Sequence, residues 1–216
     1  RLDIPEGYVE AFPTSSVRTV VVQDGGFTTM VKTDLRKKIG ENMRQLKRAH
    51  ILYSLQVGKE LSELDLPRFA FLPESIGAVY STGAEEVGMI VREMSPRPIR
   101  STRRRLIPFF SLFSLERDRP ADSFLLCQII DNLLVGKTGE EFEIFEEKIL
   151  KPYISSWAYL LLKRGFSAEM HAQNTLLEID NRGAPKRVIY RDLQDVFVDP
   201  ELREINGLSA DFNRNV

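Results

Sequence analysis

Four polar residues lie within six positions of one another in the second half of the chain. Glu169, His171, Gln173 and Asn174 belong to the segment Glu-Met-His-Ala-Gln-Asn, in a chain that has two histidines. Asp192 follows in the segment Tyr-Arg-Asp. Carboxylate and amide oxygens suit a hard cation such as Mg²⁺, and a histidine can donate to an anionic oxygen. The alternative interpretation is the solvated polar face of an edge hairpin.

A β-hairpin would bring these groups together. The apolar alternation predicts strands over residues 168–180 and 186–192, joined by a turn. Successive side chains of a strand point to opposite faces, so the first three of these polar side chains would project to one side. The second strand ends near the start of the first, which would place Asp192 close to Glu169 and Gln173. These three side chains therefore form a candidate magnesium site.

A second cluster, near the amino end, combines hydroxyl groups with cations. Ser16, Arg18 and Thr19 come at the start of a predicted strand, Lys32 closes the next strand, and Arg44 follows on a predicted helix. Arginine offers a bidentate fork and lysine a point charge, so the set suits a phosphate or a carboxylate. A solvated basic helix face is the alternative. Neither cluster contains a P-loop or a dinucleotide-binding fingerprint.

The first half of the chain mixes strand and helix patterns. β-Branched and apolar residues predict strands over 17–23 and 27–32, with Asp-Gly-Gly as the turn between them. Apolar residues at helical spacing predict an amphipathic helix over 35–46. The other elements expected before residue 95 are a helix over 51–64, strands over 68–72 and 87–92, and a loop over 80–84.

Helix patterns dominate the middle of the chain. Residues 94–105 contain two prolines and five arginines, which predicts a linker. Helices are expected over 121–135 and 140–164, with a kink or junction at Pro152 and a C-cap at Gly165. The sequence thus predicts an α+β fold that combines a mixed or antiparallel sheet with a helical part. The expected division is residues 1–95, 96–120 and 121–216.

Composition excludes several functions. Lysine and arginine total 30 and aspartate and glutamate 31, so no overall positive charge favours nucleic acid. The apolar runs are too short to cross a membrane, and we expect a cytoplasmic protein. Cys127 is the single cysteine, which excludes a disulfide framework and a cysteine-based metal or iron–sulfur site. The chain begins at Arg1, so we expect a fragment that lacks an amino-terminal part.

The two clusters together resemble the siderophore synthetases that work without a nonribosomal peptide template, of the aerobactin-synthetase type. The resemblance is carried by the segment Thr-Ser-Ser-Val-Arg-Thr near the amino end, by Lys32 followed by Arg44, and by EMHAQNTLLEID with VIYRDLQD after it. The pattern Gly-Met-Ile-Val-Arg-Glu at 88–93 is also similar. The resemblance implies the carboxy-terminal palm and thumb of a hand-like fold, with the fingers absent from this chain.

Members of that family condense a carboxylic acid, commonly citrate or a derivative, with an amine or alcohol through an acyl-adenylate. The resemblance therefore implies siderophore biosynthesis for iron acquisition, with ATP and Mg²⁺ as cofactors and a homodimer as a further expectation. Implied catalytic residues are His171, at the α-phosphate, and Arg44. Implied contacts to ATP come from Ser16, Arg18, Thr19, Lys32, Arg44, His171 and Asn174. Implied magnesium ligands are Glu169, Gln173 and Asp192.

Other functions remain as alternatives. A kinase-like phosphotransferase would place an aspartate two residues after its histidine, whereas Gln173 stands two residues after His171. A non-catalytic remnant of the synthetase fold stays open. The chain also departs from the family pattern, with Glu41 and Asn42 before Arg44 and with Leu-Gln-Asp after the Arg-Asp pair. These departures concern the substrate contacts rather than the nucleotide site.

Overall fold

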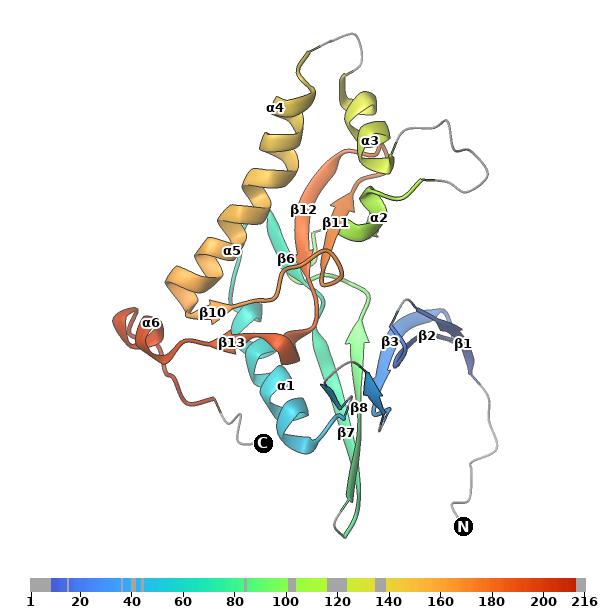
Figure 1. Cartoon of the computed structure of the whole chain (residues 1–216), viewed down its shortest axis with the longest axis vertical. Coiled ribbons are helices and arrows are strands. Elements are labelled where there is room, and N and C mark those ends of the chain that lie inside the picture. The colour runs from blue at the N-terminus through green and yellow to red at the C-terminus, as the bar shows by residue number, and fades with distance from the viewer. Residues whose placement is uncertain are drawn as a thin grey trace.

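The computed structural model of the chain has an α+β fold, as predicted, with antiparallel and mixed sheets and several helices. Figure 1 shows an elongated molecule in which the two large sheets follow one another along the long axis. The structure describes residues 9–14, 16–35, 37–39, 42–43, 45–83, 85–100, 104–115, 124–134 and 139–212. The predicted division into three parts stays a prediction.

The first large sheet is antiparallel and has the order β1-β2-β3-β8-β7. Its strands are β1 (Glu10–Pro13), β2 (Thr19–Asp24), β3 (Phe27–Thr33), β7 (Glu74–Thr82) and β8 (Glu85–Glu93). The predicted first hairpin is confirmed, with Thr19 opposite Lys32 and both turn glycines at positive φ. The loop predicted over 80–84 is wrong at its start, because Tyr80 pairs with Val87 and β7 continues to Thr82.

The helix predicted over 35–46 is wrong. The described part of that segment holds two short strands, β4 (Lys38–Ile39) and β5 (Asn42–Met43), and the helix α1 begins only at Arg48 (Arg48–Ser62). The Leu46 amide donates to Asp34 Oδ2 at 3.0 Å, and the Leu46 side chain is buried. Packing of Leu46 against the sheet, with Gly40 inside the apolar pattern, overrides the weak local preference for helix.

The second helix of the prediction, over 51–64, is confirmed by α1, which packs against β7 and β8. Two glycines allow the close approach. A Cβ at Gly88 would lie 2.1 Å from the Leu46 carbonyl oxygen, and one at Gly77 would lie 2.1 Å from Ile51 Cγ2. Both distances are far below van der Waals contact. A side chain at either glycine would therefore push the sheet away from α1 and the residues just before it.

The second large sheet joins strands from both halves of the chain. Its order is β6-β12-β11-β9, with β6 parallel to β12 and the other pairs antiparallel. The strands are β6 (Phe69–Phe71), β9 (Arg105–Pro108), β11 (Thr175–Ile179) and β12 (Pro185–Tyr190). A separate pair consists of β10 (Phe166–Ser167) and β13 (Phe197–Val198). The strands predicted over 68–72 and 87–92 are thus confirmed, although they belong to different sheets.

The hairpin expected near the carboxyl end is present, but its first strand is shorter than predicted. β11 begins at Thr175, so residues 168–174 do not form a strand. The amides of Asn174 and Thr175 both donate to the His171 carbonyl at 3.0 Å. This turn satisfies the local backbone groups without a partner strand, so the side chains of residues 169–173 do not alternate between two faces of a sheet as predicted.

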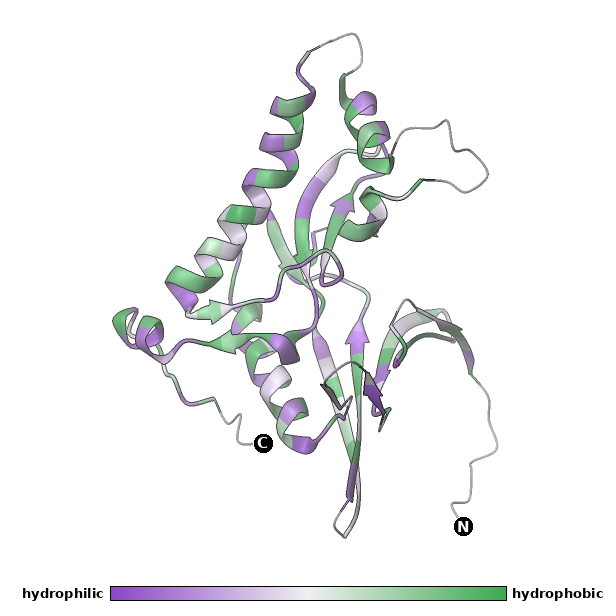
Figure 2. Ribbon diagram, in the orientation of Figure 1, coloured by the Kyte–Doolittle hydropathy of each residue, from purple (hydrophilic) through white to green (hydrophobic). Residues whose placement is uncertain are grey.

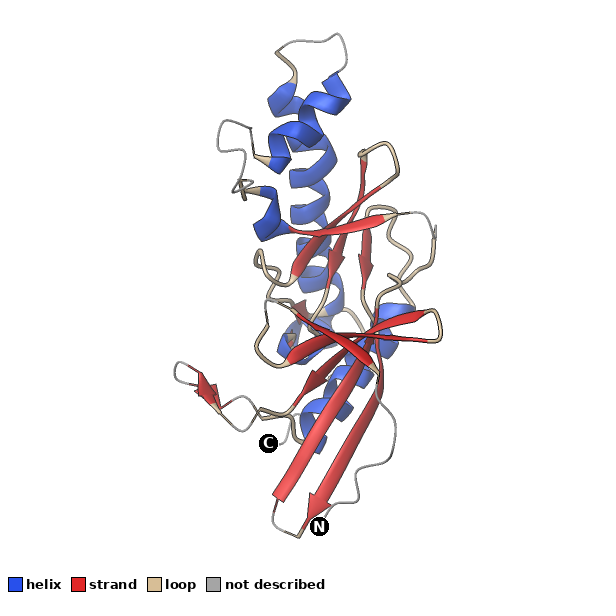
Figure 3. Ribbon diagram, turned by 90° about the vertical axis from the view of Figure 1, so that its right-hand side faces the viewer, coloured by secondary structure: helices blue, strands red, loops and turns tan. Residues whose placement is uncertain are grey.

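Helices cover one side of the two large sheets. α4, η1 and α5 form one continuous rod, which lies with α1 behind the strands in Figure 3. Figure 2 shows hydrophobic and hydrophilic residues alternating along this rod, as expected of a half-buried helix. The helices are α2 (Phe109–Leu112), α3 (Leu125–Leu134), α4 (Glu141–Phe145), the π-helical η1 (Glu146–Leu150), α5 (Lys151–Arg164), the 3₁₀ turn η2 (Leu193–Asp195) and α6 (Pro200–Ile205).

The predicted long helix is confirmed in this rod, which changes from the π-helical η1 to α5 between Leu150 and Lys151, next to Pro152. Gly165 caps α5 at φ 63°, as predicted. The largest group of buried side chains joins Tyr53 and Val57 of α1 to Phe71 and Tyr190 of the second sheet. None of the helices in the described part of the chain has the length and hydropathy of a membrane span.

We expect Gly88→Ala to lower the free energy of unfolding by about 1–3 kcal/mol, because the added methyl group would overlap the Leu46 backbone. Urea denaturation measures this change. Val87→Ala is the matched control, since Val87 is the exposed neighbour on the same strand. Equal effects of the two substitutions would show that α1 does not constrain this position.

Candidate functional site

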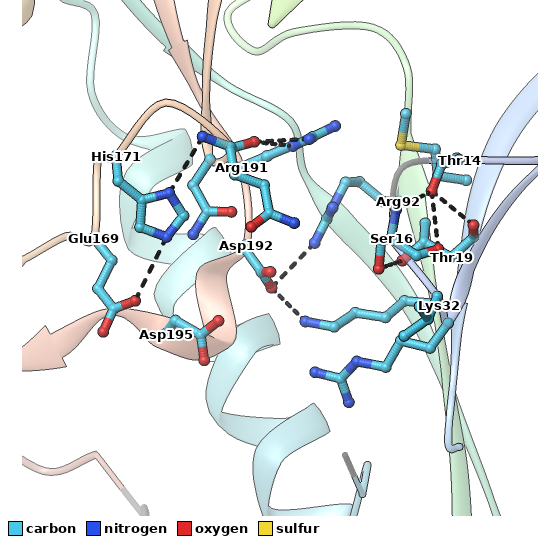
Figure 4. Close-up of a pocket in the computed structure, with 15 residues that line it drawn as sticks. Thr14, Ser16, Thr19, Lys32, Arg92, Glu169, His171, Arg191, Asp192 and Asp195 are labelled. Carbon is cyan, nitrogen blue, oxygen red and sulfur yellow. Dashed lines mark hydrogen bonds and ion pairs between the residues drawn. The ribbon is translucent and has the colours of Figure 1, made fainter. Parts of the chain in front are cut away.

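A cavity of about 440 Å³ lies where the first sheet meets the loop before β11 and the turn after β12. Both clusters singled out in the sequence line it (Figure 4). Its walls include the predicted residues Ser16, Arg18, Thr19, Lys32, Glu169, His171, Gln173, Asn174 and Asp192. Arg44, the remaining predicted site residue, lies outside the described residues.

Asp192 lies at the centre of the cavity. The Lys32 ammonium forms an ion pair with Asp192 Oδ1, and Arg92 Nη2 lies 3.2 Å from the same oxygen. Burial alone would raise the pKa of this carboxyl, but the charges of Lys32 and Arg92 outweigh it and hold the pKa well below the usual range. Arg92 also pairs with buried Glu74 at 2.5 Å. Asp192 is therefore an anion that links two buried cations of the first sheet.

The backbone at Asp192 has an uncommon conformation. Its φ is 82° and its ψ 64°, in the left-handed region that aspartate tolerates better than most side chains. The Tyr190 hydroxyl donates to the Asp192 carbonyl at 3.1 Å, and the Asp195 amide donates to it at 3.2 Å. Burial, with the Asp192 charge, raises the pKa of Tyr190 well above its ordinary value, so this donor keeps its proton. Hydrogen bonds from Tyr190 and Asp195 thus hold the strained turn that carries the Asp192 carboxylate.

The loop before β11 presents His171 to the cavity. The Gln173 amide donates to His171 Nδ1 at 3.2 Å, so in the neutral ring Nε2 carries the proton. Nε2 lies 3.9 Å from Glu169 Oε2, and both side chains are about half exposed. Arg191 donates to the Gln173 carbonyl from Nε at 3.0 Å and from Nη2 at 2.7 Å. This clamp fixes the loop against the end of β12.

Hydroxyl groups line the opposite wall, across Asp192 from His171 (Figure 4). The Thr14 hydroxyl donates to the Thr19 carbonyl at 2.8 Å and accepts from the Ser16 amide at 3.1 Å. The Thr19 hydroxyl donates to Ser16 Oγ at 3.3 Å. Arg18 is nine-tenths buried, and its Nη1 lies 3.5 Å from the Gln45 carbonyl. The turn before β2 therefore has its own hydrogen bonds and is shaped before any ligand arrives.

Sequence reasoning missed three charged residues of the cavity, Arg92, Arg191 and Asp195. A signal existed for Arg92, because strand alternation places it on the same buried face as Gly88 and Ile90. A guanidinium on a buried face needs an anion or a hydrogen-bond acceptor beside it, which could have marked Arg92 as a candidate site residue. Burial and the neighbouring Asp192 raise the pKa of Asp195. No sequence pattern indicated that residue, because its position depends on the turn after β12.

The predicted magnesium ligands stay a prediction. Glu169, Gln173 and Asp192 all line the cavity, but Asp192 is already engaged by Lys32 and Arg92. In the described part of the chain, no three His, Cys, Asp or Glu side chains stand close enough together to hold a metal ion. The predicted site offers the carboxylates of Glu169 and Asp192 and the side-chain amide of Gln173 as oxygen donors.

The fold is that of part of a siderophore synthetase. AsbB, a petrobactin biosynthesis protein of Bacillus anthracis str. Sterne, matches with a TM-score of 0.71 at 22% identity, over 94% of this chain and 34% of AsbB. ATP-bound aerobactin synthetase IucA from a hypervirulent pathotype of Klebsiella pneumoniae matches with a TM-score of 0.66 at 19% identity, over 94% of this chain and 38% of IucA. The chain therefore spans about a third of each solved relative.

Sequence comparison agrees with the fold. A profile of the IucA / IucC family matches residues 2–114, more than half of the chain, and the chain belongs to this family of siderophore synthetases. A profile described as ferric iron reductase FhuF-like transporter matches residues 147–214. The uncharacterized protein y4xN of Sinorhizobium fredii is 27% identical over an alignment of 140 residues, and the match covers 59% of this chain and 21% of that protein.

We expect Asp192→Asn to lower the free energy of unfolding by about 3 kcal/mol at pH 7, because it leaves Lys32 and Arg92 buried without their shared anion. The folded-state pKa of Asp192 is depressed. Its contribution to stability is thus present above the ordinary aspartate pKa of 3.8 and is lost as the pH falls below that value. Urea denaturation at pH 7 and at low pH measures the difference from wild type.

Asp65→Asn is the matched control, because Asp65 pairs with Arg100 at the surface and its side chain is 77% exposed. We expect this control to cost less than about 1 kcal/mol. An Asp192→Asn variant as stable as the Asp65→Asn variant at pH 7 would contradict the central role of Asp192.

Proposed function

We propose that this chain supplies the phosphate-binding and catalytic wall of an ATP-dependent siderophore synthetase. The enzyme would condense a carboxylic acid, such as citrate or a derivative, with an amine or alcohol. One observation carries the proposal: buried Lys32 and Arg92 lie opposite His171 in a single cavity. Membership of the IucA / IucC family and the ATP-bound relative IucA support it.

The cavity fits an anion such as a triphosphate. Lys32 and Arg92 are each only 3% exposed, so they are held in place before a ligand binds. Arg92 Nε is buried and has no hydrogen-bond partner among the described residues. A buried donor of this kind costs free energy until an acceptor reaches it. The positive charge of the Arg92 guanidinium would attract a phosphate, and the hydroxyls of Ser16 and Thr19 would donate to its oxygens.

The oxygen donors fit Mg²⁺ in kind. Glu169, Gln173 and the second carboxylate oxygen of Asp192 are the ligands that we propose for it. The raised pKa of Asp195 reflects burial and repulsion by Asp192, and a dication would relieve that repulsion. Bound Mg²⁺ would neutralise charge on the pyrophosphate leaving group.

The chemistry then requires two displacements. A carboxylate oxygen of the acid attacks the α-phosphorus of ATP, and the bond to pyrophosphate breaks. The amine or alcohol next attacks the acyl carbon, the bond to AMP breaks, and the nucleophile loses its proton. His171 Nε2–H would donate to an oxygen at the reacting phosphate, while Lys32 and Arg18 would offset the negative charge that develops there.

ATP binding by the folded chain, measured by titration calorimetry, tests the nucleotide site. We expect Lys32→Met to weaken ATP binding at least about tenfold, since it removes a charge-assisted contact. Lys186→Met is the control, because Lys186 pairs with Asp180 at the β11–β12 turn and does not line the cavity. Absence of ATP binding to the folded wild-type chain would overturn the proposal.

Pyrophosphate release by the full-length gene product, supplied with citrate and an amine, tests the role of His171. We expect His171→Ala to lower the rate by about 100-fold or more while ATP binding persists, since the half-exposed imidazole has little part in folding. His50→Ala is the control, because this other histidine lies on α1 and does not line the cavity. ATP binding without any pyrophosphate release would instead indicate a non-catalytic remnant.

A further inference from the structure

A second hollow, of about 360 Å³, adjoins the candidate site at the beginning of α5. We call it the α5 recess. Its walls are Tyr153, Ile154, Trp157 and Met170, and its rim is formed by Glu169 and His171. The two rim residues also line the larger cavity. The recess and the cavity therefore meet at His171, the side chain that we propose donates to the reacting phosphate.

The walls of the recess are apolar and open to solvent. Ile154 is 51% exposed and Trp157 39% exposed. The Tyr153 hydroxyl donates to the Met170 carbonyl, so the tyrosine presents its ring to the recess while its polar atom is already used. Large apolar side chains left open beside a polar site are typical of places where a ligand covers hydrocarbon surface.

We propose that the α5 recess binds the apolar body of the amine substrate and points its nitrogen towards His171. This inference rests on the proposed function, because it assigns the second substrate of that reaction. The acid and ATP would occupy the larger cavity, and the amine would reach the acyl carbon from the other side of His171. A hydrocarbon chain or an aromatic ring of the amine would pack on Trp157 and Ile154.

The chemistry of the walls favours an amine body over the adenine base of ATP. Adenine has hydrogen-bonding edges that need donors and acceptors around it. Apart from the indole N–H of Trp157 and the Tyr153 hydroxyl, which is already used, the polar side chains of the recess are Glu169 and His171. An alkyl or aryl group has no such requirement.

The chain has one tryptophan, so its fluorescence reports on the recess directly. We expect 2-phenylethylamine to shift Trp157 emission in a saturable manner, and ethanolamine, an amine of similar charge without the ring, to cause no saturable shift. Ile154→Ser should weaken phenylethylamine binding about tenfold, because it removes apolar wall area. Leu162→Ser is the matched control, since Leu162 is 55% exposed on the same helix and does not line the recess.

Besides the absence of any amine-dependent shift, three outcomes would overturn the inference. The first is an equal response of Trp157 emission to ethanolamine, and the second is an unchanged affinity for phenylethylamine in Ile154→Ser. The third is a saturable shift with adenosine but none with phenylethylamine, which would make the recess a site for the adenine base. ATP binding, measured separately by calorimetry, keeps the two proposals distinct. A chain that binds phenylethylamine at Trp157 but not ATP would contradict the proposed function alone. A chain that binds ATP but shows no amine-dependent shift would contradict only the recess.

Discussion

The ion pairs of Asp192 with Lys32 and Arg92 are the interaction on which the candidate site depends. Lys32 belongs to β3 and Arg92 to β8 of the first sheet, whereas Asp192 follows β12 of the second sheet. One carboxylate thus joins the two large sheets at the cavity. Burying these charges costs free energy unless they stay paired, so the pairing favours a single arrangement of the sheets.

Other contacts hold the same arrangement from outside the cavity. α1 lies against β7 and β8 through Gly77 and Gly88, and its Tyr53 hydroxyl donates to the Val196 carbonyl at 2.5 Å. Val196 directly follows the 3₁₀ turn that begins after Asp192. The helix therefore connects the first sheet to the turn that carries the Asp192 carboxylate. The charged side chains of the cavity are thus held in place before any ligand binds, which is the condition for strong electrostatic stabilisation of a bound charge.

Local sequence patterns predicted correctly those elements in which the tertiary packing agrees with the intrinsic preference of the residues for helix, strand or turn. The hairpin of β2 and β3 has Asp-Gly-Gly at its turn, α1 has a clear apolar period, and Gly165 ends α5. The helix predicted over 35–46 failed because Leu46 and the Asp34 carboxylate are used by the tertiary structure. The strand predicted at 168–174 failed because a turn around the His171 carbonyl satisfies the backbone.

The sequence by itself determined which chemistry was available, since carboxylates, an amide and a histidine occur at short spacing near Asn174, and hydroxyls and cations near Arg18. Only the tertiary structure decided that the two clusters share one cavity and that buried Arg92 belongs to it. The reason is separation along the chain. Lys32 and Asp192 are 160 residues apart, and Arg92 and Asp192 are 100 apart. Local propensity acts over a few residues, whereas a contact of that range exists only after both sheets have formed.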